Sequence, residues 1–252
     1  MKHFIRKATS LLFILIGCIS THSATNISDY KLWYDRPAQV WTEALPLGNG
    51  RLGAMVFGNP ASEQIQLNEA TIWAGSPNNN PNPAALKAIP ELRQLIFAGK
   101  YEEAQALATQ KVMSPTNQGM PFQPFGDLRI SFPGHTRYTD YYRDLNLDSA
   151  RTVVTYKVDG VSFKRETFTS FTDQVVVIRL TASKKQQITF NAVFTSPHQD
   201  VMIASDGNCV TLDGTTANHE LQKGKVKFQG RVTAHIQAGR LSCSDGVVSV
   251  EK

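Results

Sequence analysis

Short extended runs separated by tight-turn residues constrain this chain more than any other feature of its sequence. From about residue 31, apolar and alternating segments recur between clusters of glycine, proline, asparagine and aspartate. Asp-Gly dipeptides stand among them at 159–160, 206–207, 213–214 and 245–246. Asp-Gly accepts positive φ at both central positions of a type I′ turn, whose twist matches that of the flanking strands. The pattern predicts a sandwich or barrel of antiparallel strands and not a series of βαβ units.

The clearest predicted hairpin joins Thr152–Val158 to Val161–Thr169 through Asp159-Gly160. Further strands are predicted at Arg51–Gly58, Glu63–Asn68, Val175–Leu180, Ile188–Phe194, Val226–Ile236 and Val247–Val250. The last of these follows a turn, and the sequence ends two residues after it. We therefore expect a sandwich that is truncated at its carboxy-terminal end.

One short helical insert, at about residues 84–112, interrupts the β pattern. After an Asn/Pro-rich loop at 76–83, apolar side chains recur at helical spacing up to residue 98 and again from residue 101 to 112. Pro90 is expected to begin a new helical segment or to kink the first, and Gly99 is a natural stop. We expect this helical pair to pack on one face or end of the sandwich.

The first 24 residues have the three parts of a secretory signal. Lys2, Arg6 and Lys7 form a positive start, 11–16 is an apolar centre, and small or polar residues follow. The apolar run is too short to span a bilayer as a helix. The full chain has 26 basic and 21 acidic residues, and without the leader 23 basic residues remain, a net charge of +2. No Lys/Arg block typical of nucleic-acid binding is left, so no nucleic-acid partner is expected.

Two processing routes fit this leader. Leu15-Ile16-Gly17-Cys18 resembles a bacterial lipobox, in which Cys18 becomes the lipidated residue after cleavage. The alternative is ordinary cleavage near Ser20 or Ala24, which the small-residue rule fits less well because of His22. Either route exports the protein to the periplasm or cell surface, and only the lipid anchor would attach it to the outer membrane.

Cys209 and Cys243 are the cysteines that remain after the leader. An exported protein can hold a disulfide, but two cysteines in separate predicted strands do not establish one, because the geometry decides. The alternative is that both are small buried hydrophobic residues.

Signatures of the common catalytic and metal sites are missing. The sequence has no HExxH, no GxSxG elbow, no P-loop and no GxGxxG run, and its six histidines lack metal-ligand spacing. We therefore predict no metal and no cofactor. Glycosidases need two carboxylates across the scissile bond, and here only Glu43, Glu69 and Asp127 lie in unusual sequence. A structural hydrogen-bonding role is favoured for each, and His198 is expected to be a solvated loop residue.

The stretch Trp41–Gly58, WTEALPLGNGRLGAMVFG, is the most distinctive part of the sequence. Its glycines permit tight turns and close backbone approach. It is therefore either a turn that leads into a core strand or a loop that presents Asn49 and Arg51 to a sugar or a neighbouring domain. Tryptophans can stack on sugar rings, although a buried core position is the commoner case. The candidate substrate-edge residues are Trp41, Glu43, Asn49, Arg51, Asn68, Glu69 and Trp73, and no catalytic residue is predicted.

Several motifs resemble the amino-terminal domain of glycoside hydrolase family 95, the α-L-fucosidases. They are Trp41–Gly58, QLNEATIWAG at Gln66–Gly75, PFGDL at Pro124–Leu128, YRDLNLDSA at Tyr142–Ala150 and FKRETFTS at Phe163–Ser170. The helical insert, with PELRQLIFAGKYEEAQ at Pro90–Gln105, fits the same pattern. The resemblance runs from about residue 29 to residue 252, so the predicted organisation is a leader of residues 1–24 and one domain at 29–252.

The resemblance implies a mainly β fold, a large antiparallel β-sandwich, followed in whole enzymes by a helical linker, an (α/α)6 barrel and a small carboxy-terminal β-domain. The family acts chiefly on α-1,2-linked L-fucose in glycans with inversion, and some members take α-L-galactosides. Its acid and its water-activating residue lie in the barrel, and no position here matches them. The chain is therefore expected to be a non-catalytic fragment of an exported fucosidase, inactive alone, with the catalytic barrel and fucosylated glycans as its partners.

Two other functions compete with this interpretation. A standalone, lipid-anchored carbohydrate-binding sandwich is supported by Cys18 and the three tryptophans. A self-sufficient enzyme would use carboxylates such as Glu43 and Asp127, but no spacing supports that. Because a sandwich face built to meet a barrel should be apolar, we expect poor solubility or dimerisation of the chain alone.

Overall fold

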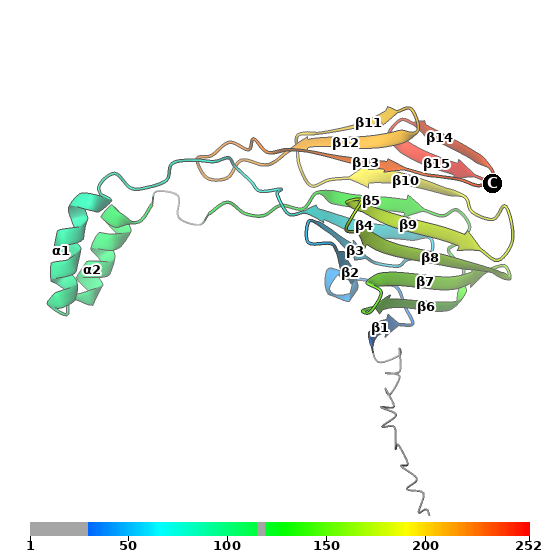
Figure 1. The fold of residues 1–252 in the computed structure, drawn as a ribbon, viewed down its shortest axis with the longest axis horizontal. Helices are drawn as coiled ribbons and strands as arrows, with labels where there is room; N and C mark the ends of the chain where they lie inside the picture. The colour runs from blue at the N-terminus through cyan, green and yellow to red at the C-terminus, as the bar shows by residue number, and fades with distance from the viewer. Residues whose placement is uncertain (1–29, 115–118) are drawn as a thin grey trace, which may run out of the picture.

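The computed structural model describes residues 30–114 and 119–252, which form strands β1 to β15 and one helical hairpin (Figure 1). The mainly β character predicted from the sequence is confirmed. The leader and Cys18 lie outside the described residues. Among the described helices, none is long and apolar enough to cross a membrane.

The strands form sheets of five, seven and three strands, and the pairings between them are antiparallel. In spatial order, the five-stranded sheet holds β1 (Lys31–Tyr34), β6 (Thr139–Asn146), β7 (Arg151–Val158), β8 (Val161–Ser170) and β9 (Val175–Ala182). The seven-stranded sheet holds β14 (Arg240–Ser244), β15 (Val247–Glu251), β10 (Phe190–Thr195), β5 (Gly126–Ser131), β4 (Ser62–Glu69), β3 (Leu52–Val56) and β2 (Leu45–Gly48). The three-stranded sheet holds β11 (Val201–Asp206), β12 (Cys209–Thr215) and β13 (Lys227–Thr233).

The seven-stranded sheet is the common layer of the sandwich, and both other sheets pack on it (Figure 1). Strands β2 and β3 contact the five-stranded sheet, whereas β14 and β15 contact the three-stranded sheet. One continuous core joins the layers, because alternate residues of each strand point inward. It includes Ile65 of β4, Leu145 of β6, Leu212 of β12 and Val248 of β15. The predicted sandwich is therefore confirmed.

The Asp-Gly turns follow the prediction at two positions and depart from it at two. Asp159-Gly160 and Asp245-Gly246 connect β7 to β8 and β14 to β15, with positive φ at both residues of each pair. The turn after β11 is shifted by one residue, since Asp206 still pairs with Cys209. The prediction is wrong at 213–214, which lies inside β12.

The physical reason for this exception is packing against the neighbouring strand. Gly214 pairs with Phe228 of β13, and a side chain at Gly214 would collide with the Phe228 ring. Asp213 of β12 accepts a hydrogen bond of 2.6 Å from Gln229, which like Phe228 lies on β13. The glycine is therefore required for a close approach between strands, and not for a turn.

The helical insert consists of α1 (Ala85–Phe97) and α2 (Tyr101–Leu107), followed by a π-helical turn at Ala108–Val112. Gly99, with φ of 73°, separates the two helices as predicted. Helix α1 runs through Pro90 as one element, so Pro90 begins no new segment.

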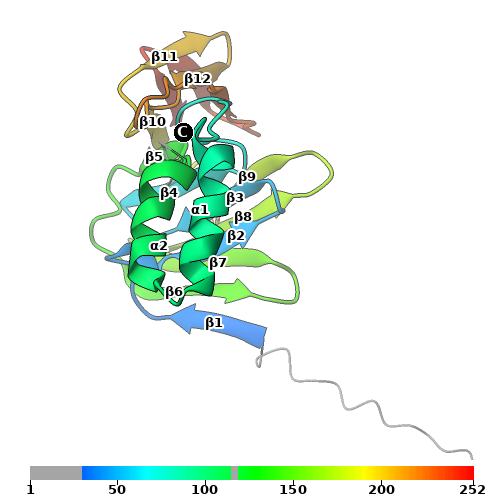
Figure 2. The same cartoon turned by 90° about the vertical axis from the view of Figure 1, so that its left-hand side faces the viewer.

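The expectation that this helical pair packs on the sandwich is wrong. Figure 1 shows it held away from the sheets at the end of extended segments, and Figure 2 views the molecule from the hairpin side, with α1 and α2 in front of the sheets. Its described contacts are between its own parts, where only Ala88 and Ala104 are buried. The Asn/Pro-rich segment at 76–83 carries no helix or strand, and this segment provides the separation.

Cys209 and Cys243 are free thiols, each half-buried. Cys243 packs against the main core, and burial raises the pKa of its thiol, with Cys209 adding to the effect. The two thiols are therefore not bridged, but the expected burial is met only in part, because neither is fully buried and Cys209 lies outside the core.

Candidate functional site

Five of the predicted substrate-edge residues lie at one end of the sandwich, and we name them the edge cluster: Asn49, Arg51, Asn68, Glu69 and Trp73. Asn49 and Arg51 occupy the turn between β2 and β3. Asn68 and Glu69 end β4, opposite Gly53 and Leu52 of β3. Because Gly53 has no side chain, it leaves space beside Asn68. Trp73 follows after a turn, just before the segment that leads to the helices.

Asn49 holds its turn together and ties it to a second turn. Its Oδ1 accepts hydrogen bonds from the backbone N–H groups of Arg51 at 3.1 Å and Leu52 at 2.7 Å. Its Nδ2 donates to the carbonyl of Ser170 at 2.7 Å, where β8 ends. The side chain therefore couples the two large sheets at this end of the molecule, as structural asparagines in turns do.

Arg51 and Glu69 form an ion pair at the surface of the same end. Arg51 Nε lies 2.8 Å from Glu69 Oε1, and Glu69 Oε2 accepts hydrogen bonds from the N–H and hydroxyl of Thr71. Burial acts to raise the pKa of Glu69, but the hydrogen bonds from Thr71 and Arg51 outweigh it, so the pKa lies below its ordinary value. Glu69 is therefore an ionised, fully engaged carboxylate, which disfavours a role as a proton donor.

Trp73 and Asn68 are the members of the edge cluster that keep an exposed ring or an unpaired polar atom. The Trp73 ring is 45% exposed and packs edge-on against Phe122 with 5.4 Å between centroids, while its Nε1 donates to the carbonyl of Ala70. Asn68 Oδ1 is buried and has no hydrogen-bond partner among the described residues. An unpaired buried carbonyl oxygen is a ready acceptor for a hydroxyl or an N–H group.

Trp41 and Glu43 lie apart from the edge cluster, in a short helical turn before the start of β2. Glu43 Oε2 accepts a hydrogen bond of 2.8 Å from the N–H of Gln39, and Oε1 lies 3.7 Å from Arg36. The Gln39 hydrogen bond is the main reason that the pKa of Glu43 is lowered. The carbonyl of Glu43 accepts a hydrogen bond of 2.8 Å from buried Arg143. The structure thus divides the predicted residues between two locations.

The tryptophans are all at the surface, so the commoner expectation of core positions is wrong for them. Trp33 is 62% exposed and Trp41 is 59% exposed. Trp33 lies on edge strand β1, where its ring stacks on Tyr142 of β6 at 6.4 Å and 19° between planes. The sandwich fills its interior with smaller aliphatic and Phe side chains, which leaves the indoles outside.

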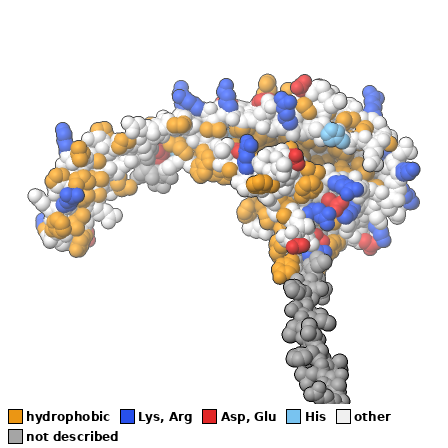
Figure 3. Space-filling view, in the orientation of Figure 1, with side chains coloured by type: hydrophobic (Ala, Val, Ile, Leu, Met, Phe, Trp, Pro, Cys, Tyr) orange, Lys and Arg blue, Asp and Glu red, His pale blue; other side chains and the backbone are white. Residues whose placement is uncertain are grey.

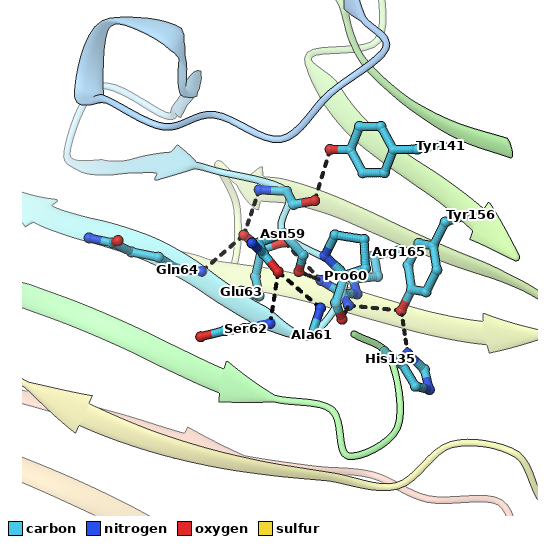
Figure 4. A network of polar contacts seen from close by, with 11 residues as sticks. Asn59, Pro60, Ala61, Ser62, Glu63, Gln64, His135, Tyr141, Tyr156 and Arg165 are labelled. Atoms are coloured by element: carbon cyan, nitrogen blue, oxygen red, sulfur yellow. Dashed lines mark hydrogen bonds and ion pairs between the residues drawn. The ribbon is translucent and has the colours of Figure 1, made fainter. Parts of the chain in front are cut away.

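A buried polar network joins the two large sheets around Arg165 (Figure 4), and the sequence analysis missed it although Arg165 lies in the motif Phe163–Ser170. Arg165 Nη1 lies 3.1 Å from Glu63 Oε2 and donates to the carbonyl of Asn59 at 2.7 Å. Its Nη2 donates to the carbonyl of Pro60 and to Tyr156 Oη. Asn59 and Pro60 precede β4 and Glu63 belongs to it, whereas Arg165 belongs to β8, so this guanidinium links the sheets through the core.

The partners of the network are themselves buried and hydrogen-bonded. Glu63 Oε1 accepts from the N–H groups of Gly58 at 2.7 Å and Gln64 at 3.0 Å. Burial raises the pKa of Glu63, and Arg165 opposes that rise. His135 Nδ1 lies 2.9 Å from Tyr156 Oη, and burial lowers the pKa of His135. Such a network fixes the relative position of two layers, because leaving any member unpaired is costly.

Neither a carboxylate pair for glycoside hydrolysis nor a metal site emerges from the described residues. A hollow of about 480 Å³ beside β7 and β8 contains one carboxylate, Asp140, which pairs with Lys157 at 2.8 Å. Asp127 binds Arg129 at 2.9 Å and Gln64 at 2.9 Å on the outer face of its sheet. No group of three or more potential metal ligands occurs in residues 30–114 or 119–252.

His198 corrects the expectation of a solvated loop histidine. Its ring is buried, its Nε2 lies 2.8 Å from the carbonyl of Pro124, and it packs on Phe228 at 4.8 Å. The sequence could not reveal this, because both contacts come from distant segments.

Comparison with known proteins adds to this geometry. Residues 32–252 match the family model described as "Glycosyl hydrolase family 65, N-terminal domain". The chain belongs to this family. It is 39% identical over 169 residues to "Alpha-L-fucosidase 2" of Arabidopsis thaliana, a match that covers 66% of this chain and 20% of that protein.

Two fungal proteins extend the comparison. "Probable alpha-fucosidase A" of Aspergillus niger is 33% identical over 199 residues, covering 74% of this chain and 24% of its own length. Its Aspergillus oryzae counterpart is 27% identical over 180 residues, covering 68% and 23%. The resemblance to the amino-terminal domain of α-L-fucosidases is thus confirmed. The family member described here spans between a fifth and a quarter of the length of these curated relatives.

Proposed function

We propose that this chain is the non-catalytic amino-terminal domain of an exported α-L-fucosidase-like glycoside hydrolase, and that the whole enzyme acts on α-1,2-linked L-fucose in glycans. The match of residues 32–252 to an amino-terminal domain of glycosyl hydrolases carries this proposal. The names of the similar proteins, all fucosidases, support the substrate class.

The described carboxylates support the non-catalytic part of the proposal. Hydrolysis of a glycosidic bond needs an acid and a second carboxylate that face each other across the sugar. Glu43, Glu69 and Asp127 are each engaged by nearby cations or hydrogen-bond donors and lie in separate places. Their surroundings stabilise structure and offer no opposed pair.

We assign the edge cluster to the side of the sandwich that borders the substrate pocket of the whole enzyme. It combines a hydrogen-bond acceptor without a partner, Asn68 Oδ1, with an exposed indole, Trp73. These are the two kinds of group that recognise the hydroxyls and the apolar face of a sugar. Trp41 and Glu43 would approach the same pocket only from a second side.

The test of this proposal is an activity assay of the purified chain. With a fucosyl-α-1,2-galactoside as substrate, the chain should release no fucose, whereas the Arabidopsis relative, assayed in parallel, provides the positive control. Turnover by the chain alone would contradict a non-catalytic role.

Export and anchoring form a separate part of the proposal. The leader at 1–24 supports export, and Cys18 supports a lipid anchor on the outer membrane. In a bacterial host fed labelled palmitate, the wild-type chain should incorporate label and Cys18→Ala should not. Equal labelling of the two chains would leave ordinary cleavage near Ser20 or Ala24 as the route.

The second candidate function, a glycan-binding module, has one specific observation in its favour. Trp33, Trp41 and Trp73 are all exposed, and Trp33 stacks on Tyr142 to form a flat aromatic surface. Titration calorimetry of the chain with fucosylated glycans tests it. Absence of binding heat with every fucosylated glycan tried would exclude this candidate.

A further inference from the structure

The outer side of α1 carries an apolar stripe, which we name the hairpin stripe: Leu86, Pro90 and Phe97. Leu86 is 84% exposed and Phe97 is 86% exposed. Positions i, i+4 and i+11 fall on one face of a helix, and exposed Arg93, at i+7, lies between Pro90 and Phe97 on that face. Ala88, on the opposite side, is the buried residue of α1. Ile96 and Tyr101 add further exposed apolar surface next to this stripe.

The helical hairpin is too small to be stabilised by its own packing. Helices α1 and α2 have 13 and 7 residues, and each buries a single alanine. Isolated helices of this length are marginal in water, because nucleation is costly and few apolar side chains are removed from solvent. Several large apolar side chains exposed on such an element mark an interaction site.

The hairpin stands apart from the sandwich, so one partner could contact both. Figure 3 shows the hairpin and the sandwich bracketing an open space, with hydrophobic side chains gathered on the hairpin. The two extended segments meet at the sandwich beside the edge cluster. There Ala74 donates to the carbonyl of Pro121, and Gln123 donates to the carbonyl of Ile72. The bracketed space is therefore bounded by the edge cluster on one side and by the hairpin on the other.

We propose that the helical hairpin is a clasp for the catalytic portion of the same enzyme. The hairpin stripe packs against that portion from one side while the sandwich end with the edge cluster meets it from the other. This inference rests on the proposed function. The similar fucosidases carry more than three quarters of their length outside the matched region, which is enough protein to fill the space. A second copy of this chain joined stripe to stripe would cover the apolar residues but leave the bracketed space empty.

A fusion protein tests the clasp. This chain is joined to the part of the Arabidopsis α-L-fucosidase 2 that lies outside the match, and hydrogen exchange of the α1 and α2 amides is compared between the fusion and this chain alone. Docking should slow exchange in both helices by about tenfold or more, because the helices then open only when the contact is broken. The double variant Leu86→Gln with Phe97→Gln should abolish the slowing. The control variant Lys87→Gln with Glu102→Gln, which alters two exposed polar residues of the same helices, should keep it.

The outcomes separate this inference from the proposed function. Fucosidase activity of the fusion, together with unchanged exchange in α1 and α2, would overturn the clasp and leave the proposed function standing. An inactive fusion would count against the proposed function, whatever the exchange result. Protection that depends on protein concentration, with a dimer in sedimentation that the double variant abolishes, would overturn the clasp in favour of a second copy.

Discussion

The sandwich and the helical hairpin bury their apolar residues to very different degrees. In the sandwich, Ile65 is 1% exposed and lies in a core shared by three sheets. In the hairpin, Leu86 and Phe97 of α1 are 84% and 86% exposed, and only alanines are fully buried. The comparison teaches that apolar residues at helical spacing can specify a regular helix even where most of those residues are not packed against another part of the molecule.

A substitution in the buried network around Arg165 should lower the unfolding free energy more than any other change proposed here. A small loss would contradict the contrast between a tightly packed sandwich and a loosely packed hairpin. Arg165→Ala leaves Glu63 buried without its cation, which typically costs about 3–5 kcal/mol of unfolding free energy. Urea unfolding followed by tryptophan fluorescence measures it. The control is Arg179→Ala, whose side chain is 71% exposed and 4.0 Å from Glu166, with an expected loss below about 1 kcal/mol. Similar losses in the two variants would mean that the network does not hold the sheets together.

A matched pair of aliphatic truncations sharpens the comparison directly. Ile65→Ala removes a core side chain and should cost about 2–5 kcal/mol. Leu86→Ala removes an exposed side chain on α1 and should change stability by less than about 0.5 kcal/mol. Both values come from urea unfolding of the isolated chain. A loss above about 1 kcal/mol for Leu86→Ala would show that the hairpin is already packed without a partner.

A substitution in the turn between β2 and β3 should reduce the stability by an intermediate amount. Asn49→Ala removes two hydrogen bonds accepted from backbone N–H groups and one donated to Ser170, with an expected cost of about 1–2 kcal/mol. Thermal unfolding by circular dichroism measures the shift. Ser131→Ala is the control, because its exposed hydroxyl makes one contact at 3.5 Å, and it should be close to neutral.

Loss of the Glu166 ion pairs on the outer face of the five-stranded sheet should cause the smallest loss of stability, and this loss should depend on pH. Lys164 Nζ lies 2.9 Å from Glu166 and Arg151 lies 3.0 Å from it. The Lys164 hydrogen bond is the main reason that the pKa of Glu166 is lowered from its ordinary 4.5. A lowered pKa means that folding favours the ionised form. The stabilisation is therefore present above pH 4.5 and is lost as the pH falls through the lowered value.

Glu166→Gln tests this pH dependence. It should reduce stability by about 1 kcal/mol or less at pH 7 and should match the wild type once Glu166 is protonated, at about pH 2. Unfolding by urea at the two pH values measures both. An equal difference at both values would mean that the carboxylate charge plays no part.

Much of the strand pattern could be predicted, because it depends on local chemistry. Alternating apolar residues and Asp159-Gly160 define the β7–β8 hairpin, and the spacing of apolar residues defines both helices. The same local rule failed at Asp213-Gly214, because Gly214 is needed there to leave room for the Phe228 ring of the neighbouring strand. Contacts of the site residues also divide into those between neighbouring segments and those between distant segments. The ion pair of Arg51 with Glu69 joins the turn before β3 to the end of the adjacent strand β4, whereas the hydrogen bond of Asn49 to Ser170 required the second sheet.

The sequence by itself determined the mainly β class, the position of the helical insert and the family, because strand periodicity, turn chemistry and contiguous motifs are all written locally in the chain. Only the tertiary structure decided that the insert stands away from the sheets and that Arg165 of the Phe163–Ser170 motif links the two large sheets through Glu63. Those outcomes depend on contacts between segments about 100 residues apart, such as Arg165 with Glu63. The order of residues along the chain does not show which distant side chains will be buried together, because the packing of the sheets on one another decides this.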